Sequence, residues 1–67
     1  MVEFGEQLRR AREGKGMTQQ SLAEQLYVTR QSVSRWECGA SDPSTSNLLT
    51  LAKLFNTTAE ELLREVQ

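Results

Sequence analysis

The segment "TRQSVSRWECG", residues 29 to 39, holds the side chains of this sequence whose types and spacing best suit binding chemistry. Hydrogen-bonding residues there surround Val33 and Trp36, the only tryptophan. Arginine bonds guanine bidentately through O6 and N7, and glutamine bonds adenine through N6 and N7, so such side chains on one helix suit the base edges of a major groove. The candidate base-reading residues are Arg30, Gln31, Ser34 and Arg35.

A helix over this segment would separate the two kinds of residue. At about 100° per residue, Thr29, Val33 and Trp36 fall within about 60° of one another, and the candidate base-reading residues and Cys38 take the opposite side. We therefore expect Val33 and Trp36 to anchor a helix from Arg30 to about Cys38, because a helix this short is unstable alone. On composition alone, outward groups of these types are more often an ordinary solvated face, because Arg, Gln and Ser are common surface residues.

The remaining apolar residues recur at helical spacing, and nothing alternates like a strand. The pattern predicts a compact all-α domain of five short helices over residues 1–67. The predicted N-caps are Thr18, Thr29, Ser44 and Thr58, the last with Glu61 at capping-box spacing. Positive-φ residues are expected to end helices at Gly14 and Gly16, at Gly39 and at Asn56. The expected core residues besides Val33 and Trp36 are Phe4, Leu8, Ala11, Leu22, Ala23, Leu26, Leu48, Leu51, Ala52 and Phe55, with Leu62, Leu63 and Val66 on the fifth helix.

The amino-acid composition limits the kinds of function that this chain can have. The net charge is −1, yet residues 7–36 carry six Arg or Lys against two Glu, and residues 37–67 carry two against five Asp or Glu. A basic first half of this kind can face a polyanion. With no His and one Cys, neither a zinc site nor a nucleophile–base pair is available, so we expect no enzyme, no metal and no cofactor. No apolar run approaches the roughly 20 residues of a membrane span, and the single cysteine suggests a reducing, cytoplasmic setting.

From Gln19 to Trp36, "QQSLAEQLYVTRQSVSRW" places Ala fifth and Val tenth and fifteenth, as a tight helix-turn-helix requires. The chain resembles the phage-repressor-like, Cro/XRE-type helix-turn-helix family over nearly its whole length. Besides this motif, the segments that carry the resemblance are "MTQQSLAEQL", "VTRQSVSRWECG", "PSTSNLLTLAKLF" and "TTAEELL". The resemblance implies a lambda-repressor-like domain with its helix-turn-helix at about residues 18–37. It also implies a transcriptional regulator, most often a repressor, that binds double-stranded DNA.

The resemblance assigns residue roles. It gives base reading to Arg30, Gln31, Ser34 and Arg35. It gives phosphate contacts to Gln19, Thr29 and Cys38, and to the helix N-terminal amides of Thr45 and Ser46, where a helix end favours anions. Gln19 would also brace the third helix. Arg12 and Glu37 match a pair that bridges the first and third helices, although such a pair on the surface would contribute little.

One residue departs from the family pattern. Tyr27 stands at the ninth position of the motif, where glycine is usual because the turn there tends to need positive φ. A left-handed conformation costs a residue such as tyrosine roughly 1–2 kcal/mol. Either the turn is strained, or its geometry differs; the ring could also stack on a neighbour.

The expected partner is a palindromic operator, read by a homodimer. Two-fold dimers read half-sites about 34–36 Å apart. The rival hypothesis is a protein-interaction or antitoxin-type module of the same fold. Leu63 and Val66 would then be exposed interface residues rather than the last of the core.

Overall fold

The structure, a computed structural model, describes residues 2–56. Four helices make up this part of the chain: α1 (Val2–Gly14), α2 (Gln19–Leu26), α3 (Arg30–Glu37) and α4 (Thr45–Leu54). Residues 2–56 contain no strand, and none of their helices is long and apolar enough to cross a membrane. The all-α prediction is confirmed. The fifth predicted helix, beginning at Thr58 with Leu62, Leu63 and Val66, lies outside the described residues.

Side-chain caps begin three of these helices as predicted. Thr18 accepts a hydrogen bond from the backbone N–H of Ser21 at 3.0 Å, and Ser21 Oγ accepts one from the Thr18 N–H, which completes a capping box. Ser44 accepts from the N–H of Asn47 at 3.2 Å in the same way. Each cap satisfies an amide that has no partner inside its helix.

The helices end on left-handed residues. The φ angles are 69° at Gly16, 59° at Tyr27, 80° at Gly39 and 57° at Asn56. After α1, α2 and α3 the following N–H reaches back to a carbonyl of the last turn, in the Schellman arrangement: Met17 to Arg12 at 3.1 Å, Val28 to Ala23 at 3.0 Å and Ala40 to Arg35 at 2.9 Å. The stops at Gly16, Gly39 and Asn56 are confirmed.

Two of the predicted boundaries need correction. Gly14 is the last helical residue of α1 rather than a left-handed stop, because Gly16 already supplies the positive φ that the end requires. The third helix ends at Glu37, one residue before the predicted Cys38, which is its C-cap.

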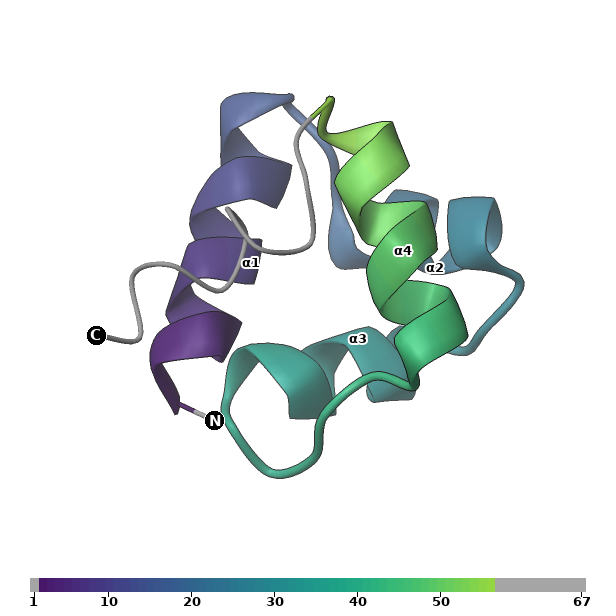
Figure 1. Cartoon of the computed structure of the whole chain (residues 1–67). Coiled ribbons are helices and arrows are strands. Elements are labelled where there is room, and N and C mark those ends of the chain that lie inside the picture. The colour runs from purple at the N-terminus through teal and green to yellow at the C-terminus, as the bar shows by residue number, and fades with distance from the viewer. Residues whose placement is uncertain (1, 57–67) are drawn as a thin grey trace.

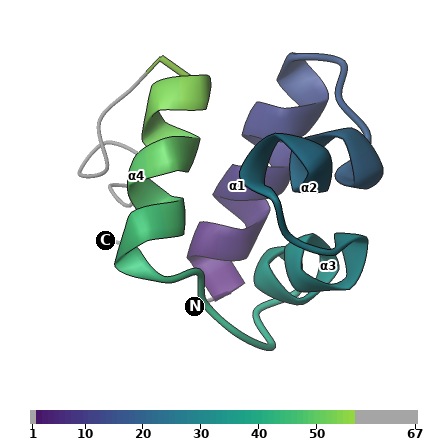
Figure 2. The ribbon, with the colours of Figure 1, turned by 90° about the vertical axis from the view of Figure 1, so that its right-hand side faces the viewer.

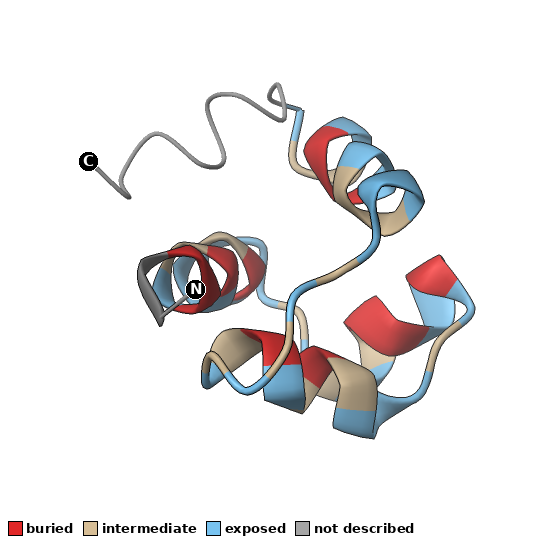
Figure 3. Cartoon of the chain, turned by 60° about the horizontal axis from the view of Figure 1, so that its bottom comes forward, coloured by how far each residue is buried: buried red, intermediate tan, exposed pale blue. Residues whose placement is uncertain are grey.

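The helices enclose one core. Figure 1 shows α3 crossing below α1 and α4, and Figure 2 shows α2 directly above α3. α3 packs against both α1 and α2, and α2 also packs against α4. Their buried segments turn toward one another, as Figure 3 shows. The core cluster consists of Phe4, Leu8, Leu22, Ala23, Leu26, Val33, Trp36 and Leu51, with Leu48 and Phe55 partly buried against it. Ala52 is buried as predicted, whereas Ala11 is only half-buried.

Candidate nucleic-acid interface

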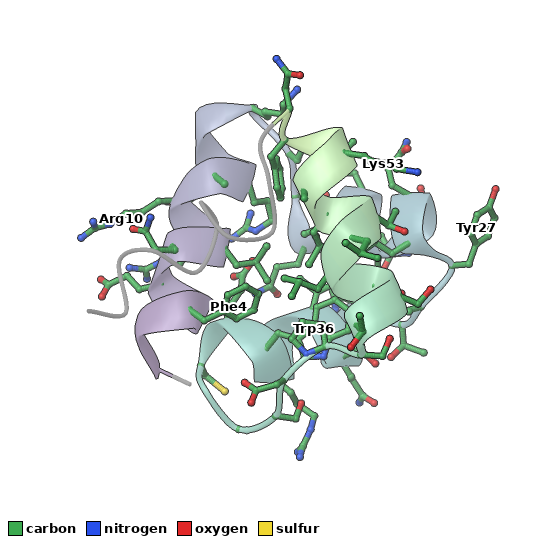
Figure 4. The ribbon with its side chains drawn as sticks, in the orientation of Figure 1. Phe4, Arg10, Tyr27, Trp36 and Lys53 are labelled. Atoms are coloured by element: carbon green, nitrogen blue, oxygen red, sulfur yellow. The ribbon has the colours of Figure 1, made fainter. Side chains whose placement is uncertain are left out.

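α3 is anchored by the two residues that its sequence pattern indicates. Val33 is fully buried, and Trp36 is 5% exposed. In Figure 4 the Phe4 and Trp36 side chains both lie toward the middle of the molecule, and the two residues belong to the same core cluster. Because both anchors lie on one side of an eight-residue helix, the opposite side must face away from the body of the protein.

The outward side of α3 carries the four candidate base-reading residues. Arg30, Gln31 and Arg35 are exposed, and Ser34 is half-buried. Together the four line one open depression on the surface. Within the described residues none of these side chains makes a hydrogen bond or an ion pair, so their donors and acceptors are available to a ligand.

Thr29 holds the N-terminal end of α3. Its Oγ1 accepts the backbone N–H of Ser32 at 3.2 Å and lies 3.1 Å from Ser32 Oγ. When Ser32 Oγ–H is the donor in that second contact, the Thr29 hydroxyl proton is left for an outside acceptor. The side chain is exposed, so the geometry is compatible with the phosphate contact that was predicted for Thr29.

Cys38 is exposed at the other end of the helix, where its Sγ–H donates to the carbonyl of Arg35 at 3.6 Å. Thiols are weak donors, so any bond from Cys38 to a phosphate would be weaker than one from a hydroxyl or an amide. Its phosphate contact stays a prediction.

A buried polar cluster ties α3 to α1 and α2. Arg12 Nε donates to Glu37 Oε2 at 2.6 Å, and Arg12 Nη2 donates to Oε1 at 3.2 Å. Arg12 Nη1 also donates to the carbonyl of Met17 at 2.8 Å, and Gln19 Nε2 donates to Glu37 Oε1 at 3.1 Å. The side chains of Arg12 and Glu37 are 10% and 5% exposed, so this is a buried bidentate pair rather than a loose surface contact.

The cluster stabilises the charged form of Arg12. The hydrogen bond to Glu37 raises the pKa of Arg12 above its ordinary value, and the charges of Glu37 and Glu13 add to this, against the lowering effect of burial. Gln19 is the first residue of α2, and its amide bonds Glu37, the last residue of α3. The bracing contact predicted for Gln19 is present, and its phosphate contact stays a prediction.

The start of α4 offers a further set of donors. Thr45 and Ser46 are exposed in its first turn, directly after the N-cap Ser44. First-turn amides lack partners inside the helix and point toward its positive end, where anions bind favourably. The phosphate site predicted at Thr45 and Ser46 therefore has suitable chemistry and stays a prediction.

The turn between α2 and α3 has the geometry that the usual glycine would allow. Tyr27 adopts φ 59° and ψ 40°, so the first of the two predicted alternatives, a strained left-handed residue, is correct. The ring does not stack on a neighbour: it is 95% exposed and projects away from the helices in Figure 4.

Gly5 is a residue of structural importance that was not predicted from the sequence. This buried residue lies inside α1, where glycine costs about 1 kcal/mol relative to alanine. A glycine inside a helical pattern is a recognised sign of close packing, and this was the signal available.

Comparisons with known proteins place the chain in a family. The helix-turn-helix family model HTH_3 matches residues 8–62. The chain is 47% identical over 62 residues to the HTH-type transcriptional activator BcrR of Enterococcus faecalis, covering 92% of this chain and 30% of BcrR. It is 42% identical over 52 residues to the HTH-type transcriptional regulator DicA of Escherichia coli K12, covering 78% of this chain and 38% of DicA. The chain thus spans less than half the length of these two relatives.

Solved structures agree with the family match. The P22 c2 repressor in complex with synthetic operator 9T superposes with a TM-score of 0.88 at 28% identity, covering 97% of this chain and 98% of the repressor chain. The restriction-modification controller protein C.AhdI of Aeromonas hydrophila superposes with a TM-score of 0.82 at 36% identity, covering 91% of this chain and 92% of the C.AhdI chain. The fold is therefore lambda-repressor-like, and the chain belongs to the phage-repressor-like, Cro/XRE-type helix-turn-helix family of DNA-binding transcriptional regulators.

Proposed function

We propose that this protein binds double-stranded DNA sequence-specifically as a transcriptional regulator, with α3 in the major groove. The observation that carries the proposal is the two-sided character of α3. Val33 and Trp36 are buried, and the opposite side presents arginine and glutamine side chains that have no partner among residues 2–56. The similar proteins include an activator, BcrR, and a repressor, P22 c2, so the family contains both activators and repressors of transcription.

Base reading belongs to four residues in this proposal. Arg30 and Arg35 suit guanine, Gln31 suits adenine, and Ser34 bonds either a base or a phosphate. The one carboxylate of α3, that of Glu37, is turned into the body of the protein and engaged by Arg12. The outward side of α3 therefore presents no negative charge to DNA.

Phosphate contacts fix how α3 lies in the groove. Gln19 is already oriented by Glu37, and the exposed Thr29 hydroxyl lies at the start of α3. The first-turn amides of α4 at Thr45 and Ser46, and more weakly the thiol of Cys38, complete the set. Contacts of this kind position a protein on the duplex without carrying sequence information.

We further propose a homodimer on a palindromic operator. One eight-residue helix contacts few base pairs, and a second copy doubles the number that are read. A two-fold dimer requires inverted half-sites whose centres are about 34–36 Å apart. Selection of bound sites from random duplex DNA tests this directly, because a monomer would select a single half-site without inverted symmetry.

A salt titration on the selected site separates DNA binding from the rival function. A protein that neutralises Z phosphates shows a log–log slope of affinity against salt near −0.9Z. A slope near zero, together with tight binding to a protein partner, would instead favour an interaction or antitoxin-type module.

Gln31→Ala tests the direct reading of a base. We expect it to cost about 1–3 kcal/mol of binding free energy on the selected site and to relax preference at one base pair. Gln25→Ala is the matched control, because Gln25 is an exposed glutamine on α2 rather than on α3. Equal weakening on all sequences would mean that Gln31 contacts only the DNA backbone.

A further inference from the structure

Gly5 is the point where the backbone of α1 meets the end of α3. A Cβ added at Gly5 would lie 2.5 Å from the carbonyl oxygens of both Trp36 and Glu37, and 2.8 Å from the carbonyl carbon of Glu37. These are backbone atoms, which cannot turn aside as the end of a flexible side chain can. Gly14, in the same helix, would place its Cβ with nothing within 4 Å. Of these two α1 glycines, therefore, only Gly5 lies where another backbone approaches too closely to leave room for a side chain.

α1 holds the end of α3 at two points. The backbone contact at Gly5 sets how closely the Trp36–Glu37 peptide approaches α1. Two helical turns further along α1, Arg12 binds the carboxylate of Glu37 through two nitrogen atoms. The first contact sets the depth of the C-terminal end of α3, and the second resists rotation of that end.

Two of the DNA contacts in the proposed function depend on this end of α3. Arg35 directly precedes Trp36, so a shift of the Trp36 peptide moves Arg35 with it. Gln19 is oriented by Glu37 across 3.1 Å. Ordinary contact begins at 3.4 Å and the two carbonyl oxygens lie at 2.5 Å, so a Cβ at residue 5 would have to displace the α3 backbone by about 0.9 Å. That exceeds the tolerance of about 0.5 Å of a preorganised binding site.

The other end of α3 is held by different contacts. The Thr29 side chain caps it, and the α2–α3 turn joins it to α2. Arg30 and Gln31 lie there, about one and a half helical turns before Trp36. A displacement caused at Gly5 would thus act more on Arg35 than on these two residues.

We infer that Gly5 is a positioning residue for DNA recognition, whose missing side chain sets the depth at which Arg35 enters the groove. This inference rests on the proposed function. It assigns specificity to a glycine of α1 that touches no DNA.

The test compares wild type, Gly5→Ala and the matched control Gly14→Ala on the selected operator and on a non-specific duplex. Partial unfolding weakens both affinities by the same factor, so the ratio of specific to non-specific affinity reports the position of α3 rather than stability. Each operator base pair is then changed in turn, with Arg35→Ala and Arg30→Ala identifying the base pairs that each arginine reads.

We expect Gly5→Ala to lower the ratio of specific to non-specific affinity at least tenfold. It should also relax the sequence preference at the base pairs identified by Arg35→Ala, and leave the preference unchanged at the base pairs identified by Arg30→Ala. Gly14→Ala should match wild type in both respects. Equal weakening on both duplexes, loss of all binding, or equal relaxation at both sets of base pairs would overturn the inference and make Gly5 a residue of folding alone. If wild type itself prefers no sequence, the proposed function fails instead, whatever Gly5→Ala does.

Discussion

Tyr27 adopts the left-handed conformation that Gly16, Gly39 and Asn56 adopt at the other helix ends. Glycine and asparagine enter this region at low cost, but tyrosine does not. Its ring is almost fully exposed, so no packing within the described residues offsets the strain. The turn keeps its geometry because the N–H of Val28 bonds the carbonyl of Ala23 and Val28 packs against the core.

Replacing Tyr27 with glycine should therefore stabilise the protein. The relief of roughly 1–2 kcal/mol is partly offset by the larger entropy that glycine loses on folding, about 0.5–1 kcal/mol. We expect a net gain of about 0.5–1 kcal/mol in the free energy of unfolding, measured with urea. Tyr27→Ala is the control: it removes the ring but keeps a Cβ, and should give no gain. A loss of stability in Tyr27→Gly would show that the ring contributes more than its exposure indicates.

Arg12 and Glu37 form the other residue-scale feature with a large expected effect. Arg12→Ala leaves the Glu37 carboxylate buried with Gln19 as its only side-chain donor among residues 2–56, and an uncompensated buried charge costs about 3–5 kcal/mol. Urea unfolding followed by the fluorescence of Trp36 measures this cost. Arg9→Ala is the matched control, because the Arg9 pair with Glu6 is about half exposed and should contribute at most about 1 kcal/mol. A change near zero in Arg12→Ala would contradict a buried pair.

At the scale of the element, α3 depends on its surroundings more than on its own residues. Eight residues form too short a helix to persist alone in water. Its order comes from two core side chains, the Thr29 cap, the Schellman end at Gly39 and the contact with α1. A helix held at both ends in this way can present its outward side without contributing much stability itself.

Removal of the cap should weaken this element measurably. Thr29→Ala is expected to lower the free energy of unfolding by about 1 kcal/mol, because the N–H of Ser32 loses its acceptor. Thr29→Ser keeps the oxygen and should stay close to wild type. Circular dichroism in urea gives both values, and equal losses in the two variants would assign the effect to the threonine methyl group instead.

The whole molecule combines a thin stability margin with an uneven charge distribution. A chain of 67 residues buries only about 60% of the surface that its unfolded form exposes. The excess of Arg and Lys lies in residues 7–36, which include α2 and all of α3 except Glu37, although the net charge is −1. The outward side of α3 carries two of these cations, Arg30 and Arg35. Binding of a polyanion there is compatible with a slightly acidic protein, because local charge decides the interaction within a Debye length of about 10 Å.

Because the margin is thin, operator binding should be visible as thermal stabilisation. Free operator at 100 times its Kd adds about 2.7 kcal/mol, and a domain of this size gains about 4–8 °C in Tm for each kcal/mol. We therefore expect an increase of roughly 10–20 °C in calorimetry on the selected duplex. A scrambled duplex of the same length and concentration should give a clearly smaller shift. Equal shifts with both duplexes would indicate binding without sequence preference.

The sequence by itself determined the helices of residues 2–56, the three N-caps, the left-handed stops and the two-sided character of α3. These features arise from neighbours in the chain, through hydrogen bonds over three to five residues and through the 3.6-residue repeat. The family resemblance identified Tyr27 as the exception in the turn. The family resemblance, rather than the residue pattern, supplied the pairing of Arg12 with Glu37.

Only the tertiary structure decided how α1 crosses α3. The close approach at Gly5, the sharing of the Glu37 carboxylate between Arg12 and Gln19, and the partial exposure of Ala11 all depend on the distance and angle between helices. Arg12 and Glu37 are 25 residues apart along the chain. Periodicity indicates which side of a helix is buried, but not how closely two backbones approach, because that distance is decided by the packing of all four described helices at once.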